Sequence, residues 1–180
     1  MEPQYDEAST FEKGMARINT GSKYGWIDKR GKVIIKPRFD RADFFVEGLA
    51  NVEIDGKWGY IDRTGKIVIS PQFDWASAFY GGDLALFRMG DKYGFVNIEG
   101  HIVIRPQFDH ALHFSEGLAP INVGGLREGK WGYINRAGVT IIEPQFDFAH
   151  EFNFGLAAVE VGDKSGYIDK TGKYIWEPTK

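Results

Sequence analysis

The sequence predicts an all-β protein made of five tandem repeats of about 34 residues each. The first observation behind this prediction is an anchor pattern, "P-x-[FY]-D", that returns at a nearly constant spacing. Its prolines are Pro3, Pro37, Pro71, Pro106 and Pro144. The second is a set of short segments with alternating apolar residues, which is typical of half-buried strands. The third is the position of the glycines: most of the 23 glycines fall in three columns that recur in every repeat.

The repeats fill the chain as a single repeat domain, residues 1–180, without a linker. Counted from anchor to anchor, repeats one to five are residues 3–36, 37–70, 71–105, 106–143 and 144–177. A unit of this size cannot bury both faces of its own sheet, so neighbouring repeats must stack. We favour an open or partly open array, because Ser165 breaks an aromatic column only in the last repeat, as a terminal cap would. A closed, propeller-like ring of five units is the alternative.

Each repeat is predicted to form a three-stranded antiparallel meander, shown here for repeat two. Residues 49–54, "LANVEI", alternate as a half-buried strand does. Asp55-Gly56 is a strong hairpin signal, and the second strand follows as "KWGYID", residues 57–62. The next turn, "DRTG", suits a type I turn.

The third strand and the connector complete the repeat. The segment "KIVIS", residues 66–70, is apolar on both faces, which predicts burial on both sides. Pro71 lacks an N–H group, so we expect this strand to end there. In the connector "PQFDWASAF", Phe73, Ala76 and Phe79 lie three residues apart, which indicates one helical turn with its aromatic rings packed under the sheet.

The motif around the second strand resembles that of the bacterial WG-repeat family, whose units carry a Trp-Gly pair within "G-K-W-G-[YF]-[IV]-[DN]". The resemblance covers all five repeats, although tyrosine replaces tryptophan in repeats one and three, and Ser165 does so in repeat five. The signature residues are Tyr24, Gly25, Trp58, Gly59, Tyr60, Tyr93, Gly94, Trp131, Gly132, Tyr133 and Gly166. The resemblance implies a bacterial interaction module, with an immunity or adaptor role as one possibility.

Composition limits the classes of function. The net charge of −3 and the pI of about 5.8 argue against a nucleic-acid-binding surface. No cysteine is present, which excludes disulfides and thiolate chemistry and fits a reducing compartment. The first ten residues carry no signal-peptide pattern, and no apolar run approaches the ~20 residues that span a bilayer. We therefore expect a cytoplasmic protein that is not bound to a membrane.

No motif announces an enzyme or a cofactor. No nucleophile elbow or phosphate-binding loop is present, and "GGLREGK" has Trp131 where a phosphate loop needs serine or threonine. The recurring Asp, Lys and Phe columns are better explained by turns, surface ion pairs and the core between repeats. We therefore predict no catalytic residue, no cofactor and no metal. The one metal alternative, should stacking bring them together, is His110, His113 and His150.

Function is expected where the repeat pattern breaks. The candidate binding residues are a four-residue insertion in repeat four, one extra residue in repeat three, and aromatic residues that stand outside the columns. They are Leu126, Arg127, Glu128, Asp83, Phe44, Trp75, Tyr80, Phe148 and Phe154. These features predict a non-catalytic scaffold that binds a protein partner. A module that binds carbohydrate or another small ligand through these aromatic residues is the alternative.

Overall fold

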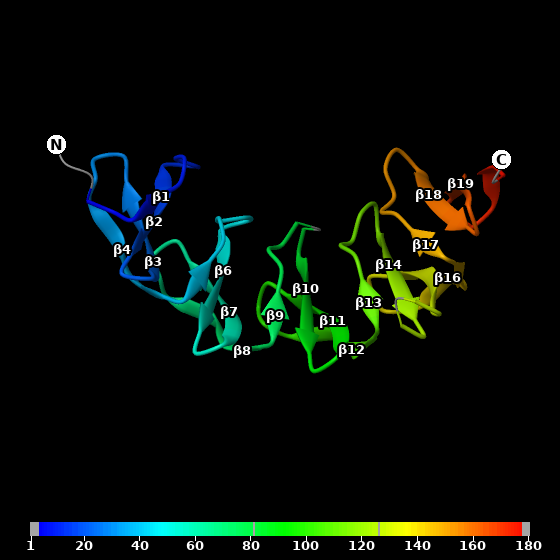
Figure 1. Cartoon of the computed structure of the whole chain (residues 1–180), viewed down its shortest axis with the longest axis horizontal. Coiled ribbons are helices and arrows are strands. Elements are labelled where there is room, and N and C mark those ends of the chain that lie inside the picture. The colour runs from blue at the N-terminus through cyan, green and yellow to red at the C-terminus, as the bar shows by residue number, and fades with distance from the viewer. Residues whose placement is uncertain (1–3, 81, 126, 178–180) are drawn as a thin grey trace. The chain divides into compact units, whose positions relative to one another are not determined.

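The computed structural model describes residues 4–80, 82–125 and 127–177, and it divides into two compact units, Met1–Phe79 and Tyr80–Lys180. We describe each unit by itself. The described residues form strands and turns only, arranged as five four-stranded antiparallel sheets that match the five repeats (Figure 1). This arrangement confirms the predicted all-β repeat fold. In the same described ranges, no helix has the length and apolar character needed to cross a membrane.

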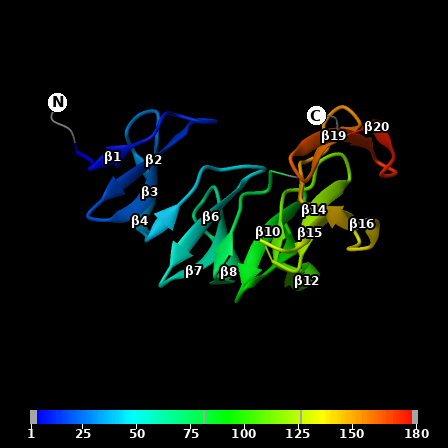
Figure 2. The ribbon, with the colours of Figure 1, turned by 45° about the vertical axis from the view of Figure 1, so that its right-hand side comes forward.

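The first unit contains two complete sheets, with strand orders β1-β2-β3-β4 and β5-β6-β7-β8 (Figure 2). Its strands are β1 Glu7–Ala8, β2 Met15–Thr20, β3 Lys23–Asp28, β4 Val33–Phe39, β5 Arg41–Ala42, β6 Leu49–Ile54, β7 Lys57–Asp62, β8 Ile67–Phe73 and β9 Trp75–Ala76.

The second unit contains β10, β11 and β12 and then two complete sheets, with orders β13-β14-β15-β16 and β17-β18-β19-β20. Its strands are β10 Leu84–Met89, β11 Lys92–Asn97, β12 Ile102–Phe108, β13 His110–Ala111, β14 Leu118–Val123, β15 Lys130–Asn135, β16 Thr140–Phe146, β17 Phe148–Ala149, β18 Leu156–Val161, β19 Lys164–Asp169 and β20 Tyr174–Trp176.

The connector adds a fourth strand to each sheet, so the predicted helical turn is wrong. In repeat two, β5 pairs with β6 through Arg41 opposite Glu53 and Ala42 opposite Val52. The backbone N–H of Asp40 donates to the carbonyl of Glu53 at 2.9 Å, which extends this short ladder. Backbone pairing with β6 satisfies the polar groups that a helical turn would otherwise have satisfied internally.

The third strand continues through its proline, contrary to the prediction that it ends there. Pro71 lies inside β8, which is the outer strand of its sheet and carries a β-bulge. Tyr60 pairs with Ile69, but Trp58 pairs with Phe73, so β8 holds two more residues than β7 over this stretch. Proline is tolerated at a bulge on an outer strand because no ladder hydrogen bond is lost there.

The bulge explains why the second glycine column exists. A Cβ atom on Gly59 would lie 2.5 Å from the carbonyl oxygen of Ile69 and 2.6 Å from the nitrogen of Pro71. Gly25, Gly94 and Gly132 meet the equivalent backbone atoms at 2.5, 2.5 and 2.4 Å. The glycine of the Trp-Gly pair is therefore required by the close approach of the bulged backbone.

The outer strand is also more exposed than the sequence predicts. Ile67 and Val68 are each 41% exposed, whereas Ile69 is 3% exposed. The prediction that this segment is buried on both faces is therefore wrong for its first half. Of these three residues, only Ile69 is buried.

Candidate functional site

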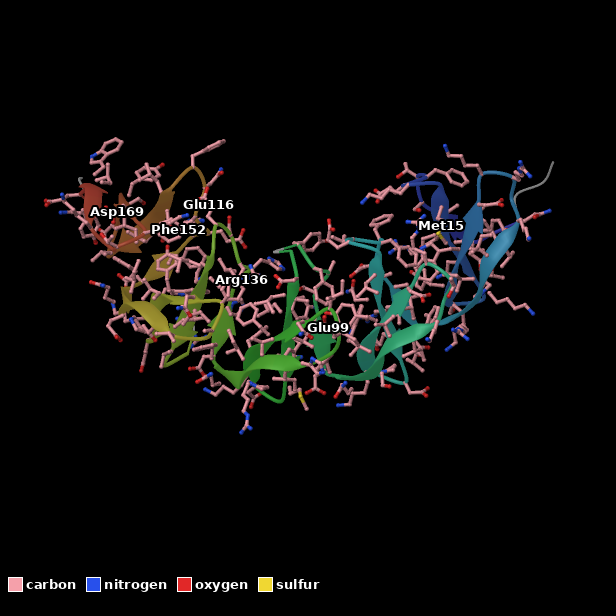
Figure 3. All side chains as sticks on the ribbon, turned by 180° about the vertical axis from the view of Figure 1, so that it is seen from behind. Met15, Glu99, Glu116, Arg136, Phe152 and Asp169 are labelled. Atoms are coloured by element: carbon pink, nitrogen blue, oxygen red, sulfur yellow. The ribbon has the colours of Figure 1, made fainter. Side chains whose placement is uncertain are left out.

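Neighbouring repeats meet at a recurring aromatic contact. In repeats one to four, the central aromatic residue of the second strand packs on a phenylalanine from the connector of the following repeat, with ring centroids 4.7 to 5.2 Å apart. These pairs are Trp26–Phe45, Tyr60–Phe79, Phe95–Phe114 and Tyr133–Phe152. Phe152 is labelled in Figure 3, with Glu116 of the preceding repeat near it. Each contact closes one part of the core between two repeats, which we call a seam.

Buried aliphatic residues complete each seam. In the column of Ile35, Ile69, Ile104 and Ile142, every side chain is 3 or 4% exposed. A Cβ atom on the turn glycine of the following repeat would meet this isoleucine closely, at 3.0 Å from Ile35 for Gly65 and at 3.3 Å from Ile104 for Gly138. The third glycine column therefore lies directly on the isoleucine of the preceding repeat.

A lysine and an aspartate tie each seam at the hairpin end. Lys23 Nζ lies 2.5 Å from Asp40 Oδ1, and Lys92 Nζ lies 2.6 Å from Asp109 Oδ1. The second carboxylate oxygen of Asp109 accepts a hydrogen bond from the N–H of Gly124 at 2.8 Å. The lysine hydrogen bond, followed by this backbone bond, holds the pKa of Asp109 below its usual range. The predicted ion pair between repeats is therefore confirmed.

The outward surface of repeat five contains the same columns without a covering repeat among the described residues. We call this surface, formed by Phe154, Leu156, Lys164, Tyr167 and Trp176, the fifth-repeat face. Tyr167 is 43% exposed, although its counterparts in the other repeats are at most 1% exposed. Trp176 occupies the isoleucine column and is 61% exposed. Phe154 and Leu156 are 93% and 36% exposed.

Repeat five changes the residues of this face but keeps it aromatic. Ser165 is exposed where Trp58 or Trp131 stands in other repeats, and Trp176 replaces an isoleucine. The rings of Tyr167 and Trp176 stack with centroids 6.2 Å apart and an interplanar angle of 25°. A terminal cap of a repeat array carries a polar outer face. The fifth-repeat face is therefore not the polar cap that Ser165 predicted.

The insertion and the extra residue of the sequence prediction lie apart from this face. Leu126 lies outside the described residues, while Arg127 and Glu128 are exposed in the hairpin between β14 and β15. Asp83 forms an ion pair with Arg136 of the following repeat. Its carboxylate thus ties two repeats together.

The predicted aromatic residues divide into packed and exposed ones. The ring of Phe44 lies under the guanidinium of Arg17, and Phe148 packs against Trp131 at 5.0 Å. Trp75 is 37% exposed, and Tyr80 is 66% exposed, with its ring in a T-shaped contact with His113 at 5.3 Å. Phe154 stands out, because its side chain is 93% exposed in a tight turn with φ of 52°. Phe154 is the one predicted binding residue that belongs to the fifth-repeat face.

The three histidines do not converge. His110 packs between Tyr93 and Trp131, with centroid distances of 4.8 and 5.6 Å. The Nδ1 atom of His113 lies 3.3 Å from Glu151, and His150 lies 4.0 Å from Glu160. Within the described ranges, no group of three or more His, Asp or Glu side chains is placed to hold a metal ion.

The titratable groups with shifted pKa values have structural partners. Asp62 accepts hydrogen bonds from Thr64 and from the N–H of Lys66, and these bonds lower its pKa. Burial raises the pKa of Tyr60, whose hydroxyl donates to the carbonyl of Ser77 at 2.6 Å. Such groups close turns and seams, and none of them sits with a second group in the pattern of a general acid and base.

The sheets, seams and bulge together define a tandem β-repeat protein. The profile of the family described as "WG containing repeat" matches residues 2–24, 24–58, 58–93, 93–126 and 131–164. These matches cover well over half of the chain, so the chain belongs to the WG-repeat family. A search of curated proteins found no match.

One solved structure shares the fold at low sequence identity. The chain is similar to one described as "Crystal structure of the eukaryotic initiation factor", with a TM-score of 0.63 and 11% identity. That match covers 98% of this chain and 55% of the other, so this chain spans little more than half its length. A protein of unknown function from Bacteroides caccae has a TM-score of 0.38, 12% identity and coverages of 98% and 82%. The tricorn protease has a TM-score of 0.34 and 14% identity, and the match covers 98% of this chain and 21% of that one. Only the first of these similarities is strong enough to support a shared fold, and it supports nothing beyond the fold.

Sequence reasoning missed Tyr167 and Trp176. Tyr167 has the aromatic residue type of its column, and such a residue is buried only when a neighbouring repeat covers it. A signal was present at Trp176, because "KYIWEP" breaks the isoleucine column at the same repeat in which Ser165 breaks the aromatic column.

Proposed function

We propose that the chain is a non-catalytic scaffold that binds another protein through the fifth-repeat face. The observation that carries this proposal is the exposure of Trp176, Tyr167 and Phe154 on one surface of one repeat. Tryptophan and tyrosine are enriched among the residues that dominate protein–protein binding energy. A contiguous apolar surface with a polar rim is typical of an interaction site. A small adaptor would use such a scaffold to hold its partner.

The contacts within the repeats support a binding role over a catalytic one. The shifted carboxylates serve turns and seams, as Asp62 and Asp109 do. The residues of the fifth-repeat face include one cation, Lys164, and large apolar side chains. This combination suits a partner surface with an apolar centre and a carboxylate at its edge.

Site-specific photocrosslinking tests this proposal. A photoreactive residue is placed at position 154 and, in a matched control, at position 47, which occupies the same turn of repeat two with φ of 49°. In an extract of the source cells, position 154 is expected to label a protein that position 47 does not label. Trp176→Ala is expected to abolish this product. Equal labelling at both positions, or labelling that survives Trp176→Ala, would rule out the fifth-repeat face as the binding site.

A carbohydrate is the second candidate ligand. The stacked, exposed rings of Tyr167 and Trp176 favour it, because amphipathic aromatic rings offer an apolar surface that a sugar ring can cover. Glycan-array screening of the wild type and Trp176→Ala tests this candidate directly. Glycan binding that disappears with Trp176→Ala, without any crosslinked protein, would favour the carbohydrate over the protein.

A further inference from the structure

The first repeat shows an uncovered surface opposite in kind to the fifth-repeat face. We call the surface formed by Asp6, Ala8, Phe11 and Gly31 the first-repeat face. Phe11 belongs to the column of connector phenylalanines and is 48% exposed, whereas Phe79, Phe114 and Phe152 are 1 to 4% exposed. Ala8 is exposed, although the other alanines of its column are buried. Among the described residues, nothing packs on these side chains as the preceding repeat packs on their counterparts.

The turn glycine of repeat one shows the same vacancy. Gly31 has φ of 80°, and nothing lies within 4 Å of a Cβ atom placed on it. The equivalent Gly65, Gly138 and Gly172 each meet the isoleucine of the preceding repeat at 3.0 to 3.3 Å. The position that an isoleucine fills in the other seams is therefore open at Gly31.

The two partners of the hairpin ion pair lie on different faces, with the lysine on the fifth-repeat face and the aspartate on the first-repeat face. One oxygen of Asp6 accepts the N–H of Gly21 at 2.8 Å, as the equivalent oxygen of Asp109 accepts that of Gly124. In the seams, the other carboxylate oxygen receives a lysine from the preceding repeat. Among the described residues, no lysine lies in ion-pair range of Asp6, and no carboxylate lies in range of Lys164.

We propose that the fifth-repeat face binds the first-repeat face of a second copy of this chain, head to tail. Each half-contact on one face has its complement on the other. Lys164 pairs with Asp6, as Lys92 pairs with Asp109. Tyr167 packs on Phe11, as Tyr133 packs on Phe152. Trp176 covers Gly31, as Ile35 covers Gly65. This inference rests on the proposed function, because it names the protein that the fifth-repeat face binds.

The exposed turn of repeat five fits the same arrangement. In the seam between repeats four and five, Lys170 donates to the carbonyl oxygen of Glu116 at 2.9 Å and pairs with its carboxylate. Phe154 occupies the turn position of Glu116 in repeat five, and Lys29 occupies the position of Lys170 in repeat one. Lys29 of the second copy therefore meets the ring of Phe154, where a cation–π contact replaces the ion pair.

The second copy is favoured over an unrelated protein by this complementarity. The fifth-repeat face offers an unpaired cation beside exposed rings, and the first-repeat face offers an unpaired carboxylate beside an exposed ring. A head-to-tail contact joins two different surfaces, so an open assembly of any length presents one free face of each kind. The mass of the assembly is therefore expected to grow with concentration, until a ring closes if the rotation permits one.

Sedimentation of the full chain between about 1 µM and about 1 mM tests this proposal, since this range spans weak to moderate affinities. The weight-average mass of the wild type is expected to rise with concentration. Trp176→Ala is expected to weaken association about thirtyfold or more, as the loss of a dominant interface residue does. Trp75→Ala, which removes a tryptophan outside both faces, is the matched control and is expected to associate like the wild type.

Charge reversal tests the direction of the contact. Lys164→Asp and Asp6→Lys are each expected to weaken self-association about fivefold, whereas the control Lys36→Asp is not. A one-to-one mixture of Lys164→Asp and Asp6→Lys is expected to associate more strongly than either variant alone. Both contacts between the two variants join opposite charges, whereas each contact between identical copies joins like charges. The double variant Lys164→Asp/Asp6→Lys is expected to regain association.

The outcomes separate this inference from the proposed function. A wild type that stays monomeric throughout this range overturns the inference, as does association that neither Trp176→Ala nor charge reversal weakens. If position 154 still crosslinks a different protein in a Trp176-dependent manner, the proposed function stands while the second copy is rejected. Circular dichroism of each variant shows that a loss of association does not come from a loss of folding.

Discussion

Substituting Gly59 with alanine should destabilise the protein through a backbone collision. The added Cβ atom would lie 2.5 Å from the carbonyl oxygen of Ile69 and 2.9 Å from the Cα atom of Pro71. Both are backbone atoms of the bulge in β8, so neither can turn away as the end of a flexible side chain would. Overpacking of this kind costs about 1–3 kcal/mol and sometimes more, and we expect the upper end of that range.

The unfolded chain reduces the net effect. Replacing glycine with alanine lowers the entropy of the unfolded state, which favours folding by about 0.4–1 kcal/mol. The expected net loss of unfolding free energy is therefore about 2–3 kcal/mol. For a chain of this size, that loss lowers the melting temperature by about 5–10 °C.

The assay is urea denaturation followed by tryptophan fluorescence, with Gly56 as the comparison. Gly56 has φ of 75° and open space around a Cβ atom, so a side chain there meets strain without a collision. Asparagine tolerates this backbone region better than alanine does. Asparagine should therefore be the milder substitution at Gly56 and should bring no relief at Gly59. A Gly59→Ala protein within about 0.5 kcal/mol of the wild type would refute the collision, because that is the ordinary effect of a surface substitution.

Three further predictions concern the seams. Tyr60→Phe removes the 2.6 Å hydrogen bond that the Tyr60 hydroxyl donates to the carbonyl of Ser77 and should cost about 0.5–1.5 kcal/mol in urea denaturation. Phe152→Ala should lower the free energy of unfolding by about 3–5 kcal/mol, because that ring is 1% exposed. Phe11→Ala, in the same column, should lower it by less than about 1 kcal/mol in dilute solution, because that ring is 48% exposed. Equal losses would contradict the exposure of the first-repeat face. Because folding lowers the pKa of Asp109, this carboxylate stabilises the fold fully above its unfolded pKa of about 3.9. The stabilisation is lost as the pH falls through the lower pKa of the folded state. The urea midpoint of Asp109→Asn should therefore fall less steeply than that of the wild type below about pH 4.

The repeat pattern predicted much of the architecture because every repeat meets the same physical constraints. The strands at 49–54 and 57–62 followed from alternation and a hairpin signal, and they are present with those limits. The connector was not predicted as a strand, because two residues carry no periodicity of their own. The course of β8 through Pro71 depends on a bulge opposite Gly59, which no local propensity encodes.

The candidate site was predicted less well, for a different physical reason. Phe154 was found because it is an aromatic residue that stands outside the recurring phenylalanine columns. Tyr167 could not be found in this way, because its residue type matches its column and its exposure depends on which repeat lies beside it. Asp83 broke the pattern, yet it forms an ion pair with Arg136 between two repeats. A residue that breaks the repeat pattern thus marks either a binding surface or a contact that holds two neighbouring repeats together.

The meander has a consequence for how the chain folds. In every strand pairing given by the register, the two strands follow one another directly in the sequence, and the widest pairing joins Leu118 to Asn135, 17 residues apart. Closing such short loops costs little chain entropy compared with bringing distant strands together. Rates of folding rise as contacts become more local, so this chain should fold faster than β-sandwich proteins of its length. A nascent chain could therefore complete its first sheet while the later repeats are still being synthesised.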